Sequence, residues 1–212
     1  MKCQQKGLMT QRKSMENNIE IFWNWFTLNK ELLSPEVVTE EQIDVLDSKI
    51  QSMGDFSWEI GYDENEGKNF LVISPEGDKD MLEKTYEIIN LAPKNINWVF
   101  YPFKQPKKWE LIFDLFIEDE EVRFDAKNWE YILYKYPDNV YDIIIKMPEE
   151  FDTYKDYLYN AAIIALEGEL GEEFVINRIN EIEIVQSFNK EEEFKKRNFI
   201  DLKSQVEKNL LK

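Results

Sequence analysis

The segment between residues 98 and 147 constrains the fold most, because it holds several strand-like stretches joined by short turns. These stretches cover residues 98–103, 111–117, 122–126, 129–136 and 140–147. In the last of them, Tyr141, Ile143 and Ile145 occupy alternate positions, as in a strand with one buried face. Short connections favour antiparallel pairing. The sequence therefore predicts an α+β fold with a mostly antiparallel sheet of about five to eight strands and helices packed on it.

Helical patterns flank these strands at both ends of the chain. The first helix is predicted over residues 16–33, and its aromatic residues surround nearly the whole circumference, so that it needs cover on more than one side. We expect core packing, and Trp23 and Trp25 are the candidates if this helix instead forms an interface. The second helix of this N-terminal pair begins at Thr39, which forms a capping box with Gln42. A short C-terminal helix follows Asp201.

The length of 212 residues suits one sizeable domain, which we place at residues 16–212. Residues 1–15 are polar and basic and lack the apolar region of a secretory signal, so we expect a disordered tail. The apolar runs are far shorter than a membrane span. The sequence thus predicts a cytoplasmic protein that makes no membrane contact.

The formal net charge is −17. Such a chain repels phosphate backbones, and we expect no nucleic-acid binding. A surface dense in carboxylates attracts a basic protein partner instead. The alternative interpretation is that the charge serves solubility alone.

Two residue types needed for common active sites are missing or scarce. The chain has no histidine, which excludes Ser-His-Asp and Cys-His nucleophiles and imidazole metal sites. Its one cysteine, Cys3, excludes an intrachain disulfide and a thiolate cluster, and we expect no cofactor. Catalysis by carboxylate side chains is the main classical mechanism that remains open to this chain.

One acidic run lies between two predicted strands and comprises Asp114, Glu118, Asp119, Glu120, Glu121 and Asp125. Asp114, Glu118 and Asp119 are its candidate metal ligands, since hard cations prefer carboxylate oxygens. The run lacks the glycine-turn spacing of a calcium loop, and a solvated turn is the alternative interpretation. Glu120 and Glu121 are candidates for contacting a partner.

A second acidic group supplies the candidate catalytic residues Glu169, Glu172 and Glu173. On a continuous helix they share a face, because residues three and four apart are neighbours. Two adjacent glycines fit a cleft lined by these acids. The alternative is a helix end whose acids face water.

Several stretches resemble an uncharacterised bacterial family of acidic cytoplasmic α+β proteins. They are Phe22-Trp23-x-Trp25-Phe26, the stretch from Leu71 to Asp78, Leu91-Ala92-Pro93 with Trp98 downstream, and Gly168-Glu169-Leu170-Gly171-Glu172. The resemblance spans most of the chain after Met15, and it implies no activity and no catalytic residue. An analogy with toxin immunity proteins of comparable make-up rests on the fold class alone.

Three functions remain open from the sequence. The first is a non-catalytic binding or regulatory protein that recognises a basic protein. The second is a structural module that self-associates as a homodimer through the first helix. The third is a carboxylate-dependent hydrolase that uses a divalent metal. We favour them in that order.

Overall fold

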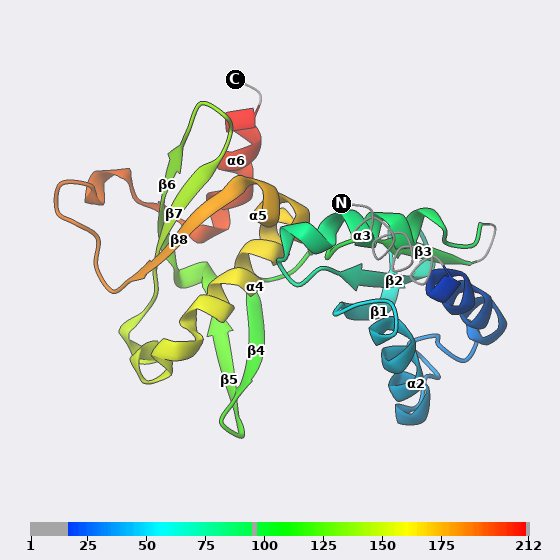
Figure 1. The fold of residues 1–212 in the computed structure, drawn as a ribbon. Coiled ribbons are helices and arrows are strands. Elements are labelled where there is room, and N and C mark those ends of the chain that lie inside the picture. The colour runs from blue at the N-terminus through cyan, green and yellow to red at the C-terminus, as the bar shows by residue number, and fades with distance from the viewer. Residues whose placement is uncertain (1–16, 95–96, 211–212) are drawn as a thin grey trace, which may run out of the picture. The chain divides into compact units, whose positions relative to one another are not determined.

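The computed structural model describes residues 17–94 and 97–210 (Figure 1). The contacts within the chain divide it into two compact units, Met1–Lys104 and Gln105–Lys212, whereas the sequence suggested one domain over residues 16–212. The predicted tail, residues 1–15, lies outside the described residues. Within the described ranges, no helix is long and apolar enough to cross a membrane.

The predicted α+β class and the mostly antiparallel pairing are confirmed. The described strands form three sheets rather than one, a three-stranded sheet in the first unit and a two-stranded and a four-stranded sheet in the second. Two pairings are parallel, that of Lys68–Ser74 (β2) with Trp98–Tyr101 (β3) and that of Tyr141–Lys146 (β7) with Ile179–Val185 (β8). In each case a helix lies between the two strands in the sequence, as a parallel connection requires.

The first unit begins with a helix over residues 17–29. It continues with α2 (Glu40–Gln51), β1 (Ser57–Asp63), β2 (Lys68–Ser74), α3 (Lys79–Asn90) and β3 (Trp98–Tyr101). The predicted capping box starts α2, since the Thr39 hydroxyl and the Gln42 side chain each accept a backbone N–H of the other residue. The Asp78 carboxylate caps α3 by accepting the N–H of Asp80 at 2.8 Å.

One face of the three-stranded sheet carries the core of the first unit. The strand register places Trp58 beside Ile73, and Leu71 between Ile60 and Phe100. All three helices contribute side chains to the same cluster. These side chains include Phe22, Trp23 and Phe26 from the first helix, Leu46 and Ile50 from α2, and Ile88 from α3. The aromatic residues of the first helix are therefore largely core, as expected.

The second unit holds the remaining elements. They are β4 (Ile112–Ile117), β5 (Glu120–Asp125), β6 (Glu130–Lys135), β7 (Tyr141–Lys146), α4 (Leu158–Leu170), α5 (Glu172–Arg178), β8 (Ile179–Val185), β9 (Arg197–Asn198) and α6 (Leu202–Leu210). Short 3₁₀-helices cover Ala126–Asn128, Glu149–Tyr157, Glu193–Lys195 and Phe199–Asp201. Figure 1 shows β6, β7 and β8 side by side.

The core of the second unit forms where α4 packs on the inner face of the four-stranded sheet. Ala161, Ala162 and Ala165 are fully buried there, with Tyr131 and Ile145 in the same cluster. The hairpin β4–β5 and helix α6 complete the cluster. The small alanine side chains permit the close approach of α4 to its neighbours.

The segment that precedes β4 packs closely against two glycines at the end of α4. A Cβ on Gly168 would lie 2.2 Å from the Trp109 ring, and a Cβ on Gly171 would lie 3.0 Å from Pro106. The N–H of Lys107 donates to the carbonyl of Gly168 at 2.7 Å. Gly171 has a φ of 84°, which ends α4 and lets α5 begin in a new direction.

Candidate functional site

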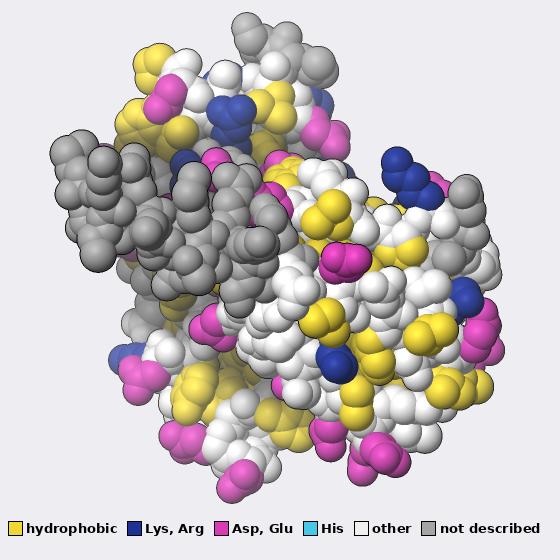
Figure 2. Space-filling view, turned by 45° about the vertical axis from the view of Figure 1, so that its right-hand side comes forward, with side chains coloured by type: hydrophobic (Ala, Val, Ile, Leu, Met, Phe, Trp, Pro, Cys, Tyr) yellow, Lys and Arg dark blue, Asp and Glu magenta, His cyan; other side chains and the backbone are white. Residues whose placement is uncertain are grey.

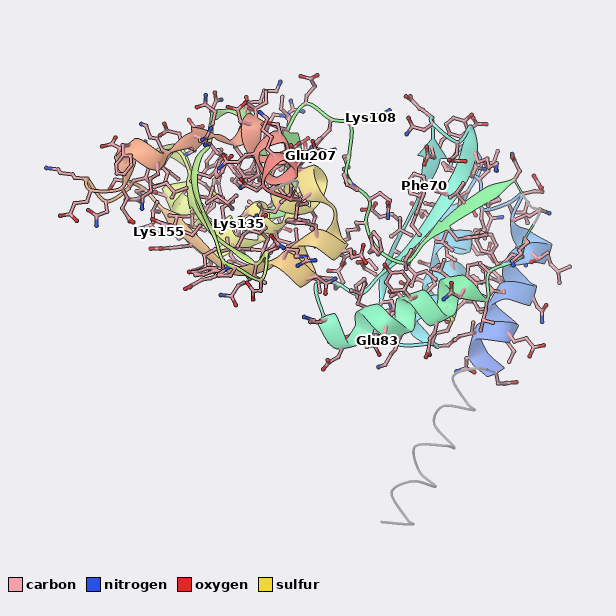
Figure 3. All side chains as sticks on the ribbon, turned by 90° about the horizontal axis from the view of Figure 1, so that it is seen from above. Phe70, Glu83, Lys108, Lys135, Lys155 and Glu207 are labelled. Atoms are coloured by element: carbon pink, nitrogen blue, oxygen red, sulfur yellow. The ribbon has the colours of Figure 1, made fainter. Side chains whose placement is uncertain are left out.

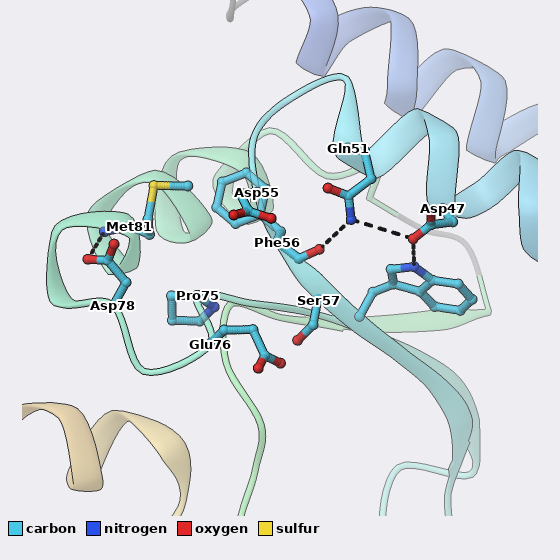
Figure 4. A pocket seen from close by; sticks show the side chains of 10 residues that line it. Asp47, Gln51, Asp55, Phe56, Ser57, Pro75, Glu76, Asp78 and Met81 are labelled. Carbon is cyan, nitrogen blue, oxygen red and sulfur yellow. Dashed lines mark hydrogen bonds between the residues drawn. The ribbon is translucent and has the colours of Figure 1, made fainter. Parts of the chain in front are cut away.

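A pocket of about 590 Å³ lies in the first unit, where the end of α2, the start of β1 and the turn before α3 meet (Figure 4). We call it the acidic pocket, and its lining consists of Asp47, Gln51, Asp55, Phe56, Ser57, Trp58, Pro75, Glu76, Asp78 and Met81. Four of these ten residues carry carboxylates and none is Lys or Arg. Phe56, Trp58 and Met81 add apolar surface.

Strand register and one tight turn build this pocket. Ser57 pairs with Ser74, so the start of β1 lies beside the end of β2. The turn that follows is closed by a hydrogen bond from the Asp78 N–H to the Pro75 carbonyl at 3.0 Å. Its two central residues, Glu76 and Gly77, both have positive φ. No pattern in the sequence indicated that this turn and the start of β1 border a pocket.

The four carboxylates differ in how they are held. Asp47 accepts a hydrogen bond from Trp58 Nε1 at 3.0 Å. Glu76 forms an ion pair with Lys104 at 3.0 Å, and Asp78 caps α3. Asp55 is exposed and has no hydrogen-bond or ion-pair partner among the described residues. Asp55 is therefore the carboxylate most available to a ligand.

Glu76 is held in its charged form. Partial burial raises the pKa of Glu76, but the Ser57 hydroxyl and the Lys104 ammonium outweigh it and keep the pKa below its ordinary value. The Ser57 oxygen is itself buried and forms no hydrogen bond of normal geometry with the described residues. It still lies on the same side of the pocket as the Glu76 carboxylate (Figure 4).

The carboxylates surround the pocket without converging on one point. Across residues 17–94 and 97–210, no group of three or more Asp, Glu, His or Cys side chains is placed to hold a metal ion. Acidic side chains are also spread over the face shown in Figure 2, with Lys and Arg side chains scattered among them. This arrangement fits an organic cation of the size of a guanidinium or ammonium side chain better than a small metal ion.

The predicted metal ligands do not form a cluster. Asp114 on β4 forms an ion pair with Arg123, its neighbour on β5, at 3.1 Å. Glu118 and Asp119 make the turn between these strands, both with positive φ, and Glu120 and Glu121 are exposed at the start of β5. The solvated turn, which was the alternative interpretation, describes this run.

The turn at Glu118 and Asp119 offers a prediction on stability. Positive φ at both central residues matches a type I′ turn, for which Asn-Gly is favoured and Glu is strained. Replacing the pair with Asn-Gly is expected to raise the free energy of unfolding by about 1 kcal/mol. Chemical denaturation measures this change. The double variant Glu120→Gln and Glu121→Gln is the control, and an equal gain there would assign the effect to charge rather than to backbone strain.

The candidate catalytic glutamates do not share a helical face, because the chain breaks at Gly171 between Glu169 and Glu172. Glu169 is half-buried and accepts a hydrogen bond from Trp109 Nε1 at 3.1 Å. Glu172 is fully buried and Glu173 is half-buried. These acids therefore do not form the solvent-facing helix end of the alternative interpretation, and their predicted catalytic role stays a prediction.

Glu169 supports a prediction on pH dependence. Burial raises the pKa of Glu169, although the Trp109 hydrogen bond and Lys203 act in the opposite direction. A carboxyl whose pKa is raised on folding stabilises the fold most below its unfolded-state pKa, and this stability is lost as the pH rises through the folded-state pKa. Glu169→Gln is thus expected to be more stable than the parent at pH 7 and equally stable near pH 4. Thermal melts of both proteins across this range test it, and a variant that is less stable at pH 7 contradicts it.

The two tryptophans named as interface candidates have different environments. Trp23 is 5% exposed, and its Nε1 donates to the carbonyl of Ile88 at 2.9 Å. It is therefore a core residue. Trp25 is half-buried against the same core. Ile21 and Leu28 on this helix are exposed, so self-association through the helix stays a prediction.

Comparison with known proteins gives no further guide to the site. No protein-family model, no curated protein and no solved structure matches this chain.

Proposed function

We propose that this chain is a non-catalytic binding protein that recognises a basic protein partner through the acidic pocket. The observation that carries the proposal is the lining of the pocket, which has four carboxylates and no basic side chain. A lysine or arginine side chain of the partner fits this chemistry. Its charged end would meet Asp55 and share the Glu76 carboxylate with Lys104, and its aliphatic stem would lie against Phe56 and Met81.

Two further features support this proposal. The Trp58 ring lines the same pocket, and aromatic faces attract cations within about 6 Å. The net charge of −17 would draw a basic partner toward the surface from a distance, which speeds association at low salt. A hydrolase that relies on clustered carboxylates receives less support, because the acids of this pocket surround it rather than meet.

Binding of a cationic peptide tests the proposal. A labelled arginine-rich peptide of about eight residues is titrated with the full chain, and fluorescence anisotropy gives the Kd. The double variant Asp55→Asn and Glu76→Gln is expected to raise the Kd about tenfold. Raising the ionic strength is expected to weaken binding to the parent protein, because salt screens exposed charges.

A matched control removes the same charge elsewhere in the first unit. Glu64 and Glu83 are exposed and lie outside the pocket, and Figure 3 labels Glu83 on α3. The double variant Glu64→Gln and Glu83→Gln is expected to change the Kd less than twofold, because solvent screens exposed charges that lie away from the binding site. If both double variants weaken binding equally, net charge alone attracts the peptide and the acidic pocket is not the site.

A further inference from the structure

Strand β8 forms an open edge of the four-stranded sheet. In the strand order it is terminal, and among the described strands it pairs only with β7. The carbonyl of Val185 accepts the N–H of Met147, directly after β7, at 3.3 Å. Backbone direction alternates along a strand, so the polar groups of Glu181 and Glu183 also face β7. Those of Ile182 and Ile184 therefore point to the unpaired edge.

A groove lies at the end of β8, where the ends of β7 and β8 face the Glu149–Tyr157 helix and the start of α4. Its volume is about 370 Å³, and its lining consists of Met147, Pro148, Asp152, Lys155, Leu158, Tyr159, Ile184, Val185 and Gln186. Most of these side chains are apolar. Tyr159 is 53% exposed. A strand added to β8 would direct alternate side chains into this groove.

The outer side of the same edge is acidic. Glu181 and Glu183 are exposed and have no ion-pair or hydrogen-bond partner among the described residues. They line a second, smaller pocket of about 210 Å³ together with Asp142, Tyr134 and Tyr136. Asp142 is satisfied locally, since it accepts hydrogen bonds from Tyr136 at 2.6 Å and from Asn180 at 2.9 Å. The two glutamates remain available to an incoming cation.

We propose that an extended segment of a basic partner protein adds to β8 as a further strand, with Lys or Arg alternating with apolar residues. The apolar side chains would enter the groove at the end of β8, and the basic ones would lie across from Glu181 and Glu183. The main-chain groups of Ile182 and Ile184 supply the hydrogen bonds. A second copy of this chain is a poor occupant, because pairing β8 with itself would set these glutamates against their own copies.

The inference shares with the proposed function only the basic character of the partner. The acidic pocket lies in the first unit and β8 lies in the second, so variants separate the two sites. The probes are labelled peptides of about eight residues in which Val and Lys alternate. A block peptide of the same composition, with all Val before all Lys, is the control for charge. Two further alternating peptides carry N-methyl groups on either the odd or the even backbone nitrogens.

The full chain is expected to bind the alternating peptide at least about tenfold more tightly than the block peptide. One N-methylated peptide is expected to lose about tenfold in affinity and the other to bind nearly as well, because only one set of N–H groups meets the strand. The double variant Glu181→Lys and Glu183→Lys is expected to lose about tenfold in affinity for the alternating peptide. Glu207→Lys on α6 is expected to reduce this affinity less. Equal binding of the alternating and block peptides, or equal binding of both N-methylated forms, would overturn strand addition.

The outcomes also separate this inference from the proposed function. If the variants at Glu181 and Glu183 weaken binding of the alternating peptide and those at Asp55 and Glu76 do not, the peptide binds at the β8 edge and the acidic pocket does not take part. The reverse result supports the acidic pocket and rejects the edge. Because the N-methyl groups are on the peptide, the main-chain test does not depend on whether a variant folds.

Discussion

Replacing Trp23 with alanine is expected to lower the free energy of unfolding by about 3–5 kcal/mol. The side chain is 5% exposed and its ring packs edge-on against Phe26 and Phe100, with centroid separations of 5.7 and 4.7 Å. Truncation would remove this packing and leave a cavity that rigid neighbours fill only in part. It would also leave the carbonyl of Ile88 without the hydrogen bond from Trp23 Nε1.

Denaturant unfolding followed by far-UV circular dichroism measures this loss. Trp25→Ala on the same helix is the matched control, and because Trp25 is only half-buried its cost is expected to be clearly smaller. A different result would follow if Trp23 contacted a partner. Trp23→Ala would then leave the stability of the isolated chain unchanged, and the core assignment would be wrong.

Gly168→Ala is expected to lower the free energy of unfolding by about 2 kcal/mol. The added Cβ would lie 2.2 Å from the Trp109 ring, a distance that the packing does not allow. The ring is restrained by its hydrogen bond to Glu169 and by contact with Phe113 at 5.8 Å, so moving it disturbs both. In an open helix the same substitution would stabilise the protein, since alanine favours helix by about 1 kcal/mol over glycine. A decrease in the free energy of unfolding would therefore indicate the close contact with Trp109, and an increase would indicate an open helix position.

A double-mutant cycle with Trp109→Ala tests this explanation. Once the ring is absent, Gly168→Ala is expected to be neutral or stabilising. Thermal or chemical denaturation of the two single variants and the double variant gives the coupling energy. If Gly168→Ala costs as much without the ring as with it, the clash with Trp109 is not the cause.

The sequence predicted most elements of the fold, because their signals are local. The capping box at Thr39 and the alternation through Tyr141, Ile143 and Ile145 each act within a few residues, and the structure confirms them. The division into two units and the parallel pairing of β7 with β8 were not predicted. Both depend on contacts between residues far apart in the chain, and periodicity carries no information about these.

The candidate site was predicted less well for the same reason. The acidic runs at residues 118–121 and 167–173 are conspicuous in the sequence, yet the first is a turn with two strand positions and the second is broken by Gly171. The acids of the acidic pocket are single residues spread from Asp47 to Asp78. The pairing of β1 with β2, which sets Ser57 beside Ser74, brings two of their segments together. The sequence signal that could have indicated the pocket is weak, because its acidic residues do not form a run in the sequence.

The contact of Phe199, which directly follows β9, with Trp129, which directly precedes β6, has a consequence for synthesis on the ribosome. The N–H of Phe199 donates to the carbonyl of Trp129 at 2.9 Å, and the ring of Phe199 packs on that of Trp129. About 70 residues separate these partners in the sequence, which corresponds to about 4–14 s of translation at typical rates. During that interval Trp129 and Tyr131 would lack the cover that the Phe199 ring gives them in the folded chain. This part of the core is therefore complete only after Phe199 has been synthesised.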